Sequence, residues 1–157
     1  MSADTDPGQT RVPAAGPALD PVVAPALDPA VVAELQRSQR EFGNPGFIAQ
    51  LVALFRANAP ARMAAIREAV TAHDGGSLGH TAHTLKSNCA MLGAKRMAGI
   101  CERLEACGDS GSFDEAAACS EGKALLGDAE RELARVLAEL ALLAACQKSE
   151  VRSQKSE

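Results

Sequence analysis

Apolar residues recur every three to four positions along most of the chain, which is the spacing of helices that bury one face. No run alternates with a period of two, so the chain is predicted to be all-α. Breaks in the pattern delimit the elements. Helices are expected from Pro29 to Arg40, from Phe47 to a restart at Pro60, from there to Val70, from about Asp74 to Leu92, from Arg96 to Cys107 and from about Phe113 to Ala145. The short connections favour antiparallel neighbours, hence an up-down bundle.

The two ends of the chain differ from this helical middle. Residues 1–27 contain five prolines and are predicted to be a disordered leader. Asp28 is placed to cap the first helix, with Pro29 at its first position. Residues 147–157 are polar and are expected to form a flexible tail. The predicted helical domain therefore covers residues 28–146.

The composition suits a core of closely packed helices. Hydrophobic residues make up 46% of the chain but aromatic residues only 3%. Three of the four phenylalanines, Phe42, Phe47 and Phe55, are expected to anchor the core between the first helices. The five cysteines show no paired spacing and are interpreted as buried apolar residues in a reducing compartment, which indicates a cytoplasmic protein.

Charge and hydropathy exclude two classes of partner. The net charge is −4 and there is no Tyr or Trp, whereas nucleic-acid binding calls for a basic face and rings that stack on bases. The most apolar stretch, from Val136 to Cys146, is too short to span a membrane and contains Glu139. The first ten residues lack the basic and apolar regions of a secretory signal.

One histidine is predicted to stand on the outer face of a helix. On a helical wheel of 100° per residue, an apolar stripe faces the core, and His83 points roughly 140° away from its centre. The stripe consists of Leu78, Ala82, Leu85, Cys89 and Leu92. Lys86 and Ser87 lie one turn after His83 on the exposed side.

An exposed imidazole beside a lysine is suited to carry a phosphoryl group. A neutral imidazole is a nucleophile near pH 7 because its unperturbed pKa is about 6.5. The negative charge of a phosphoryl group on the ring could then be neutralised by the lysine three residues along. Geometry alone does not distinguish this role from that of a solvated surface histidine.

The residue types around His83 resemble the histidine-containing phosphotransfer (HPt) domains of multistep phosphorelays. The matching motifs are Ala82-His83-Thr84-Leu85-Lys86, Leu92-Gly93 and Cys101-Glu102-Arg103-Leu104-Glu105. The flanking segments fit as well, so the resemblance covers roughly residues 27–145. One departure is Ser87, where the family most often has glycine. Serine is still small, and its hydroxyl could donate to the phosphate.

The resemblance implies a four-helix bundle with an additional N-terminal helix over one end. It implies that His83 is the phosphoacceptor and that Lys86 stabilises the phosphoryl oxygens. Response-regulator receiver domains and a hybrid sensor histidine kinase would be the partners, and the receiver would supply the Mg²⁺. A monomer is expected. The receiver-docking face would comprise His80, Ser87, Ala90, Lys95 and Arg96. With no nucleotide-binding motif of its own, the chain is expected to be a phosphocarrier and not a kinase.

The sequence leaves two alternative functions open. A helical adaptor could use the same surface to bind a receiver or kinase domain without carrying phosphate, although it would need neither His83 nor Lys86. A metal site at His80 and His83, with His73 near in sequence, is conceivable, but no carboxylate or thiol on that face completes it. We therefore expect no metal.

Overall fold

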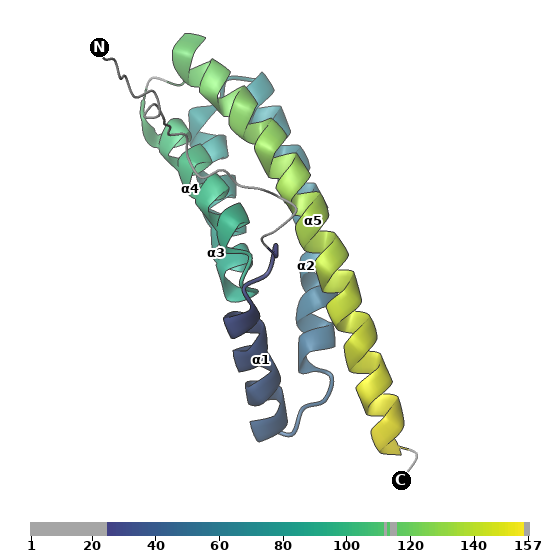
Figure 1. Ribbon diagram of the computed structural model, residues 1–157. Coiled ribbons are helices and arrows are strands. Elements are labelled where there is room, and N and C mark those ends of the chain that lie inside the picture. The colour runs from purple at the N-terminus through teal and green to yellow at the C-terminus, as the bar shows by residue number, and fades with distance from the viewer. Residues whose placement is uncertain (1–24, 112, 114–115, 156–157) are drawn as a thin grey trace, which may run out of the picture.

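The computed structural model describes residues 25–111, 113 and 116–155, and within these residues the chain forms five α-helices and no strand. They are α1 (Pro29–Glu41), α2 (Phe47–Thr71), α3 (Gly75–Met91), α4 (Lys95–Asp109) and α5 (Ala116–Lys155) (Figure 1). The all-α prediction is confirmed. The predicted leader lies outside the described residues, except for its last three positions.

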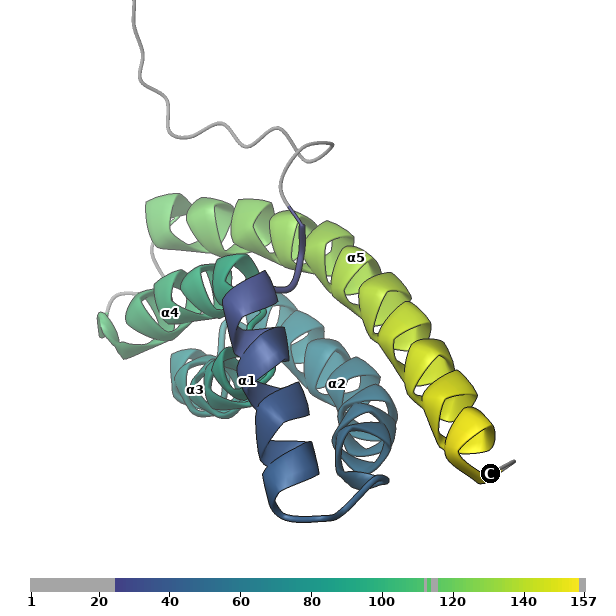
Figure 2. The ribbon, with the colours of Figure 1, turned by 60° about the horizontal axis from the view of Figure 1, so that its bottom comes forward.

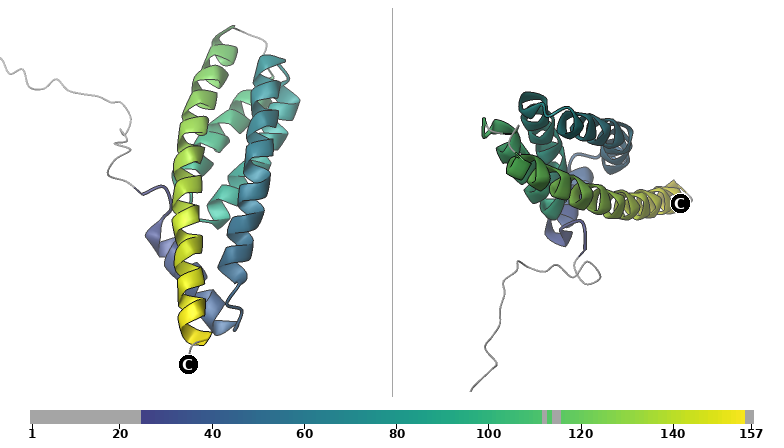
Figure 3. Two further views of the ribbon diagram at one scale, coloured as in Figure 1. Left: turned by 90° about the vertical axis from the view of Figure 1, so that its right-hand side faces the viewer. Right: turned by 90° about the horizontal axis from the view of Figure 1, so that it is seen from above.

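Helices α2 to α5 form an up-down bundle, and α1 lies across one end of it (Figures 1 and 2). Helix α5 runs beside α2 over most of its length, and α3 and α4 form a tight antiparallel pair (Figure 3). This is the four-helix bundle with an additional N-terminal helix that the family resemblance implied.

The helix boundaries follow from local side-chain and backbone chemistry. The Asp28 carboxylate accepts a hydrogen bond from the Ala30 backbone N–H at 2.8 Å, and Pro29 begins α1 as expected. Asp74 caps α3 by accepting from the Ser77 backbone N–H at 3.0 Å. Gly93 ends α3 with φ of 83°, and its carbonyl accepts from the Asp28 N–H at 2.8 Å. The turn between α3 and α4 is thereby tied to the start of α1.

The predicted restart at Pro60 is wrong, because Pro60 lies inside the continuous helix α2. The buried stripe continues through it, from Val52 and Ala59 to Met63 and Ile66. Pro60 itself is exposed, so its ring faces away from the bundle. The packing of that stripe outweighs the lost backbone hydrogen bond.

The expectation of a flexible tail after residue 146 also differs from the structure, since α5 continues to Lys155. Gln147 is 2% exposed, and its side-chain oxygen accepts from Gln39 Nε2 of α1 at 2.6 Å. This buried contact holds the chain in helical form beyond the last apolar turn. The polar residues that follow are mostly good helix formers.

The core is built from the predicted stripes, with one exception among the aromatic anchors. The α3 stripe of Leu78, Ala82, Leu85 and Cys89 is fully buried, and Phe55 is buried with it. Phe47 packs against the core from a half-buried position. Phe42 is 82% exposed, because it follows the last residue of α1 and the chain turns away at Gly43, where φ is 64°.

None of the helices in the described part of the chain combines the length and apolar character needed to cross a bilayer.

A carboxylate of α5 fastens the segment that precedes α1. The two oxygens of Glu139 accept hydrogen bonds from the Ala26 N–H at 2.6 Å and from the Leu27 N–H at 2.9 Å. The side chains of Ala26 and Leu27 are buried in the core. Glu139 thus satisfies two partly buried donors in the segment that precedes α1.

Glu139→Ala should lower the free energy of unfolding by about 1–3 kcal/mol, because two partly buried N–H groups lose their acceptor. Denaturant titration followed by circular dichroism measures this. The control is Glu150→Ala, which removes an exposed carboxylate from the same helix and should change stability by less than about 0.5 kcal/mol. Equal stability of the two variants would contradict this account of Glu139.

Candidate functional site

The candidate site lies halfway along α3, on the face turned away from the core. The His83 side chain is 61% exposed, while its neighbours Ala82 and Leu85 are fully buried. The wheel prediction for His83 is therefore confirmed. Lys86 is one turn further along, with a half-buried side chain that is 27% exposed.

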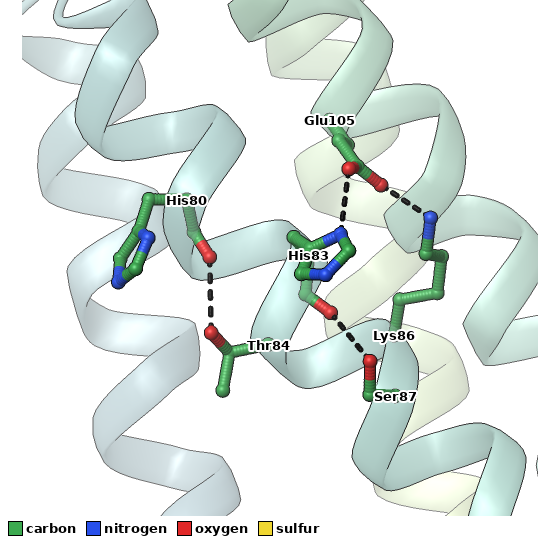
Figure 4. A network of polar contacts seen from close by, with 6 residues as sticks. All are labelled: His80, His83, Thr84, Lys86, Ser87 and Glu105. Atoms are coloured by element: carbon green, nitrogen blue, oxygen red, sulfur yellow. Dashed lines mark hydrogen bonds and ion pairs between the residues drawn. The ribbon is translucent and has the colours of Figure 1, made fainter.

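A carboxylate from the neighbouring helix joins these two side chains. Glu105 of α4 has one oxygen 2.7 Å from His83 Nδ1, and its other oxygen accepts from Lys86 Nζ at 2.5 Å (Figure 4). The Glu105 side chain is only 20% exposed. His83 and Lys86 are thus held by one shared anion, and they do not contact each other directly.

This arrangement fixes the roles of the two imidazole nitrogens. An ionised carboxylate can only accept, so Nδ1 carries the proton and donates to Glu105. In the neutral ring, Nε2 then holds the free lone pair. Figure 4 shows Nε2 on the side of the ring away from Glu105. The site therefore presents an oriented nucleophile to solvent.

The mutual effects on pKa keep the shared anion charged. The hydrogen bond from Lys86, followed by that from His83, lowers the pKa of Glu105 below its usual range. The hydrogen bond to Glu105 raises the pKa of Lys86 above its usual range, against the effect of burial. Glu105 and Lys86 are consequently both charged across the neutral pH range.

Glycines set the separation of the two helices that carry the site. A Cβ on Gly108 would lie 2.4 Å from the Gly75 carbonyl oxygen and 2.6 Å from the Gly79 nitrogen. A Cβ on Gly79 would lie 2.5 Å from Asp109 Oδ1. The α3 and α4 backbones therefore touch about one turn from His83 and Glu105. This close approach brings the Glu105 carboxylate within reach of α3.

Residues 50–146 match the family model described as Hpt domain. This chain belongs to the Hpt domain family. The fold agrees with the crystal structure of histidine-containing phosphotransfer protein B (HptB) from Pseudomonas aeruginosa PAO1. The two chains are 29% identical with a TM-score of 0.66, and the match covers 78% of this chain and 96% of that one. A search of curated proteins found no match.

Membership in the Hpt family gives the chain a histidine phosphotransfer role in phosphorelays. Hpt domains are phosphocarriers without kinase activity, and they partner with receiver domains and kinases. The matched segment begins within α2, so α1 lies outside it.

The five residues expected on the docking face of the Hpt domain occupy different surroundings. His80, Ser87 and Ala90 are exposed on α3. The Ser87 hydroxyl donates to the His83 carbonyl oxygen at 3.2 Å, so in this structure it is engaged with backbone and does not point at a phosphate position. Their docking role stays a prediction.

Lys95 and Arg96 are engaged with carboxylates of their own chain. Lys95 Nζ lies 2.5 Å from the capping Asp28 at the start of α1. The Arg96 guanidinium is 3.6 Å from Glu132 of α5, a buried carboxylate that also binds Arg135. The structure therefore does not bring these two cations together with His83 and Lys86, although Lys95 stays largely exposed.

Within the described residues, no group of three His, Cys, Asp or Glu side chains is arranged to hold a metal ion. His73, the third histidine of the conceivable metal site, lies in the turn before α3, with φ of 58°. Its ring contacts Phe113, and its Nε2 is 3.8 Å from Cys119 Sγ of α5. It is therefore engaged at a different position from His83.

The sequence reasoning left Glu105 without a role, although Glu105 belongs to the quoted Cys101–Glu105 motif and contacts both His83 and Lys86 in the structure. The sequence does contain information that predicts the contact between Glu105 and His83. A helical hairpin that turns at Gly93–Ala94 places position 83 opposite position 105, because both are eleven residues from Ala94. Pairing the two helices about that turn would have predicted the contact.

Gly108→Ala should force α4 away from α3 and cost about 1–3 kcal/mol in unfolding free energy, because its Cβ meets backbone and not a movable side chain. Gly99→Ala is the control on the same helix, since a Cβ there meets nothing within 4 Å. It should be neutral or stabilising by up to about 1 kcal/mol. Denaturant titration of both variants measures the two changes in unfolding free energy. Equal changes would contradict the close approach of the α3 and α4 backbones.

Glu105→Gln should be less stable than the wild type at neutral pH, and the difference should vanish on acidification. A carboxylate with a lowered pKa stabilises the fold above its unfolded pKa, and this stabilisation is lost as the pH falls through the folded pKa. Thermal unfolding between about pH 7 and pH 3 measures it. Glu68→Gln, an exposed change on α2, is the control. A pH-independent difference would contradict the charged pair.

Proposed function

We propose that this Hpt domain is a phosphorelay intermediate that accepts a phosphoryl group on His83 Nε2 from a receiver-domain aspartate. It then passes the group to the aspartate of another response-regulator receiver. The observation that carries the proposal is the hydrogen bond between His83 Nδ1 and Glu105, which leaves the other ring nitrogen unprotonated and exposed.

The transfer step moves one phosphoryl group between two nucleophiles. The Nε2 lone pair attacks the phosphorus atom, the bond from phosphorus to the aspartyl oxygen breaks, and its electron pair returns to the carboxylate. The ring of the product carries positive charge, with Nδ1 still donating to Glu105. The carboxylate of Glu105 stabilises that charge, and the reverse reaction uses the same contacts.

Lys86 has a second task once the phosphoryl group is attached. Its ammonium group is held by Glu105 at 2.5 Å, beside the ring that is modified. The phosphoryl oxygens carry more negative charge than one carboxylate, so they compete for the same ammonium. We expect Lys86 to bind the phosphoryl oxygens in the loaded state.

The remaining components of the reaction would come from the partner. A receiver domain would contribute the aspartate together with its Mg²⁺ ion, as the family resemblance implies. A hybrid sensor kinase is the expected upstream donor, through its receiver domain. The small exposed residues Ser87 and Ala90 beside His83 leave room for such a domain to approach.

The direct test mixes the chain with a receiver domain labelled by ³²P on its aspartate, in the presence of Mg²⁺. We expect acid-labile label on the wild type and none on His83→Gln. His73→Asn is the control, because it removes a histidine in the turn before α3, outside the predicted docking face, and asparagine tolerates the positive φ there; it should keep the label. Label on His83→Gln would overturn the assignment of the phosphoacceptor.

Lys86→Ala should fold and bind the receiver but transfer roughly 10–100-fold more slowly. This is the rate equivalent of about 1.5–3 kcal/mol for one charged hydrogen bond in the transition state. Rapid-quench kinetics with the same labelled receiver measure the rate. A wild-type rate would show that the ammonium plays no part in transfer.

The adaptor alternative makes a different prediction for the same reagents. If the protein is an adaptor, the wild type and His83→Ala should bind a receiver or kinase domain with the same affinity, and neither should acquire label. Calorimetric binding measured beside the labelling assay separates this outcome from phosphotransfer.

A further inference from the structure

The segment that precedes α1 is bound between α5 and the turn that links α3 to α4 (Figure 2). Its backbone is held at three points. The N–H groups of Ala26 and Leu27 donate to Glu139 of α5, and the Asp28 N–H donates to the Gly93 carbonyl oxygen at 2.8 Å. The side chains of Ala26 and Leu27 are 2% and 5% exposed. This binding site, which we call the seat, therefore holds a short peptide by its backbone and by two buried apolar side chains.

Further contacts select the residues that follow. The Asp28 carboxylate caps α1 and lies 2.5 Å from Lys95 Nζ, and Pro29 is the first residue of α1. Val31 packs on Gly93, where an added Cβ would lie only 2.8 Å from Val31 Cβ. The seat therefore accepts the sequence Ala-Leu-Asp-Pro, with a valine two positions after the proline.

The same sequence occurs a second time, eight residues earlier in the chain. Residues 17–21 read Pro-Ala-Leu-Asp-Pro, as residues 25–29 do, and Val23 corresponds to Val31. Each side chain that contacts the seat is thus present twice at the same spacing. The first copy lies outside the described part of the chain, and the second copy fills the seat.

The connecting chain allows the first copy to reach the seat, although at a cost. Eight additional residues would form a loop between the seat and the rest of α1, and the cost of closing a loop rises only slowly with its length. The first turn of α1 would be lost, because Pro25 would fall at the fifth helical position and has no N–H to donate. Ala24 would also replace the half-buried Val32. The second copy, which continues into a full helix, is therefore the preferred occupant.

We propose that residues 18–21 replace residues 26–29 in the seat when the second copy is withdrawn. The exchange would keep the Gly93 carbonyl paired, now with the Asp20 N–H, and would release the start of α1. Helix α1 could then move away from the bundle without freeing the turn between α3 and α4. Neither His83 nor Lys86 takes part in the exchange, so its test does not depend on phosphotransfer.

The occupant that we propose belongs to the same chain and not to a second molecule. A short tether gives the first copy an effective concentration on the order of millimolar at its own seat. A second molecule at micromolar concentration would compete poorly with it.

The test is amide hydrogen exchange of the full chain, followed by NMR, with one copy disabled. Leu27→Asp introduces a charge where the leucine is 5% exposed, so the second copy no longer fits the seat. We expect this variant to stay folded. Its Ala18 and Leu19 amide protons should exchange at least about tenfold more slowly than in the wild type, because Glu139 now accepts from them.

The matched control is Leu19→Asp, the same substitution in the first copy. It should leave the protection of the Ala26 and Leu27 amides as it is in the wild type. The double variant Leu19→Asp/Leu27→Asp disables both copies, so neither pair of amides should be protected. Its denaturant midpoint should fall by more than the sum of the two single effects, because only the double variant leaves the seat empty.

Three results would overturn the proposal. The first is that Leu27→Asp unfolds, or stays folded while Ala18 and Leu19 exchange as fast as in the wild type. The second is a denaturant midpoint of the double variant equal to that of Leu27→Asp. The third is protection of Ala18 and Leu19 that appears only as the protein concentration rises and a dimer forms in sedimentation, because the occupant would then come from a second copy.

Discussion

The Glu105 carboxylate, shared between His83 Nδ1 and Lys86 Nζ, is the contact on which the proposed function of this bundle depends. Without it, the imidazole would be an ordinary solvated side chain that exchanges between two tautomers. With it, one nitrogen is committed to donation and the other is kept as a nucleophile. The same anion holds the ammonium group beside the position that a phosphoryl group would occupy. In the proposed transfer, one carboxylate therefore prepares both the attack and the neutralisation of the product.

The bundle supplies this contact through backbone proximity more than through side-chain bulk. Helices α3 and α4 approach so closely at Gly75, Gly79 and Gly108 that no Cβ fits at Gly79 or Gly108 without a shift. The fully buried stripe of α3 fixes its rotation, so that His83 must face solvent. The turn at Gly93 is anchored to α1 through the Asp28 N–H. Rotation, separation and register of the hairpin are thus each set by a different part of the sequence.

The features that the sequence could predict are those that depend on periodicity. The exposure of His83 followed from the apolar stripe alone, and the cap at Asp28 from local side-chain chemistry. Glu105 was missed because a wheel treats each helix separately, while this contact depends on how two helices pair. The sequence predicted a helix break at Pro60 and a flexible tail after residue 146, and the structure has continuous helix at both places. The burial of Ala59 and Gln147 stabilises the helix there against the local preference of the sequence. Phe42 was expected in the core, but it is exposed because α1 ends just before it and the chain turns away.

The proposed function requires that Glu105 reserve Nε2 of His83 as the reactive nitrogen. The most direct measurement is ¹⁵N and ³¹P NMR of the phosphorylated chain with ¹⁵N-labelled histidine, which identifies the nitrogen bonded to phosphorus. We predict a single phosphohistidine, modified at Nε2 of His83, with Nδ1 still protonated. Attachment at Nδ1, or at another residue, would contradict it.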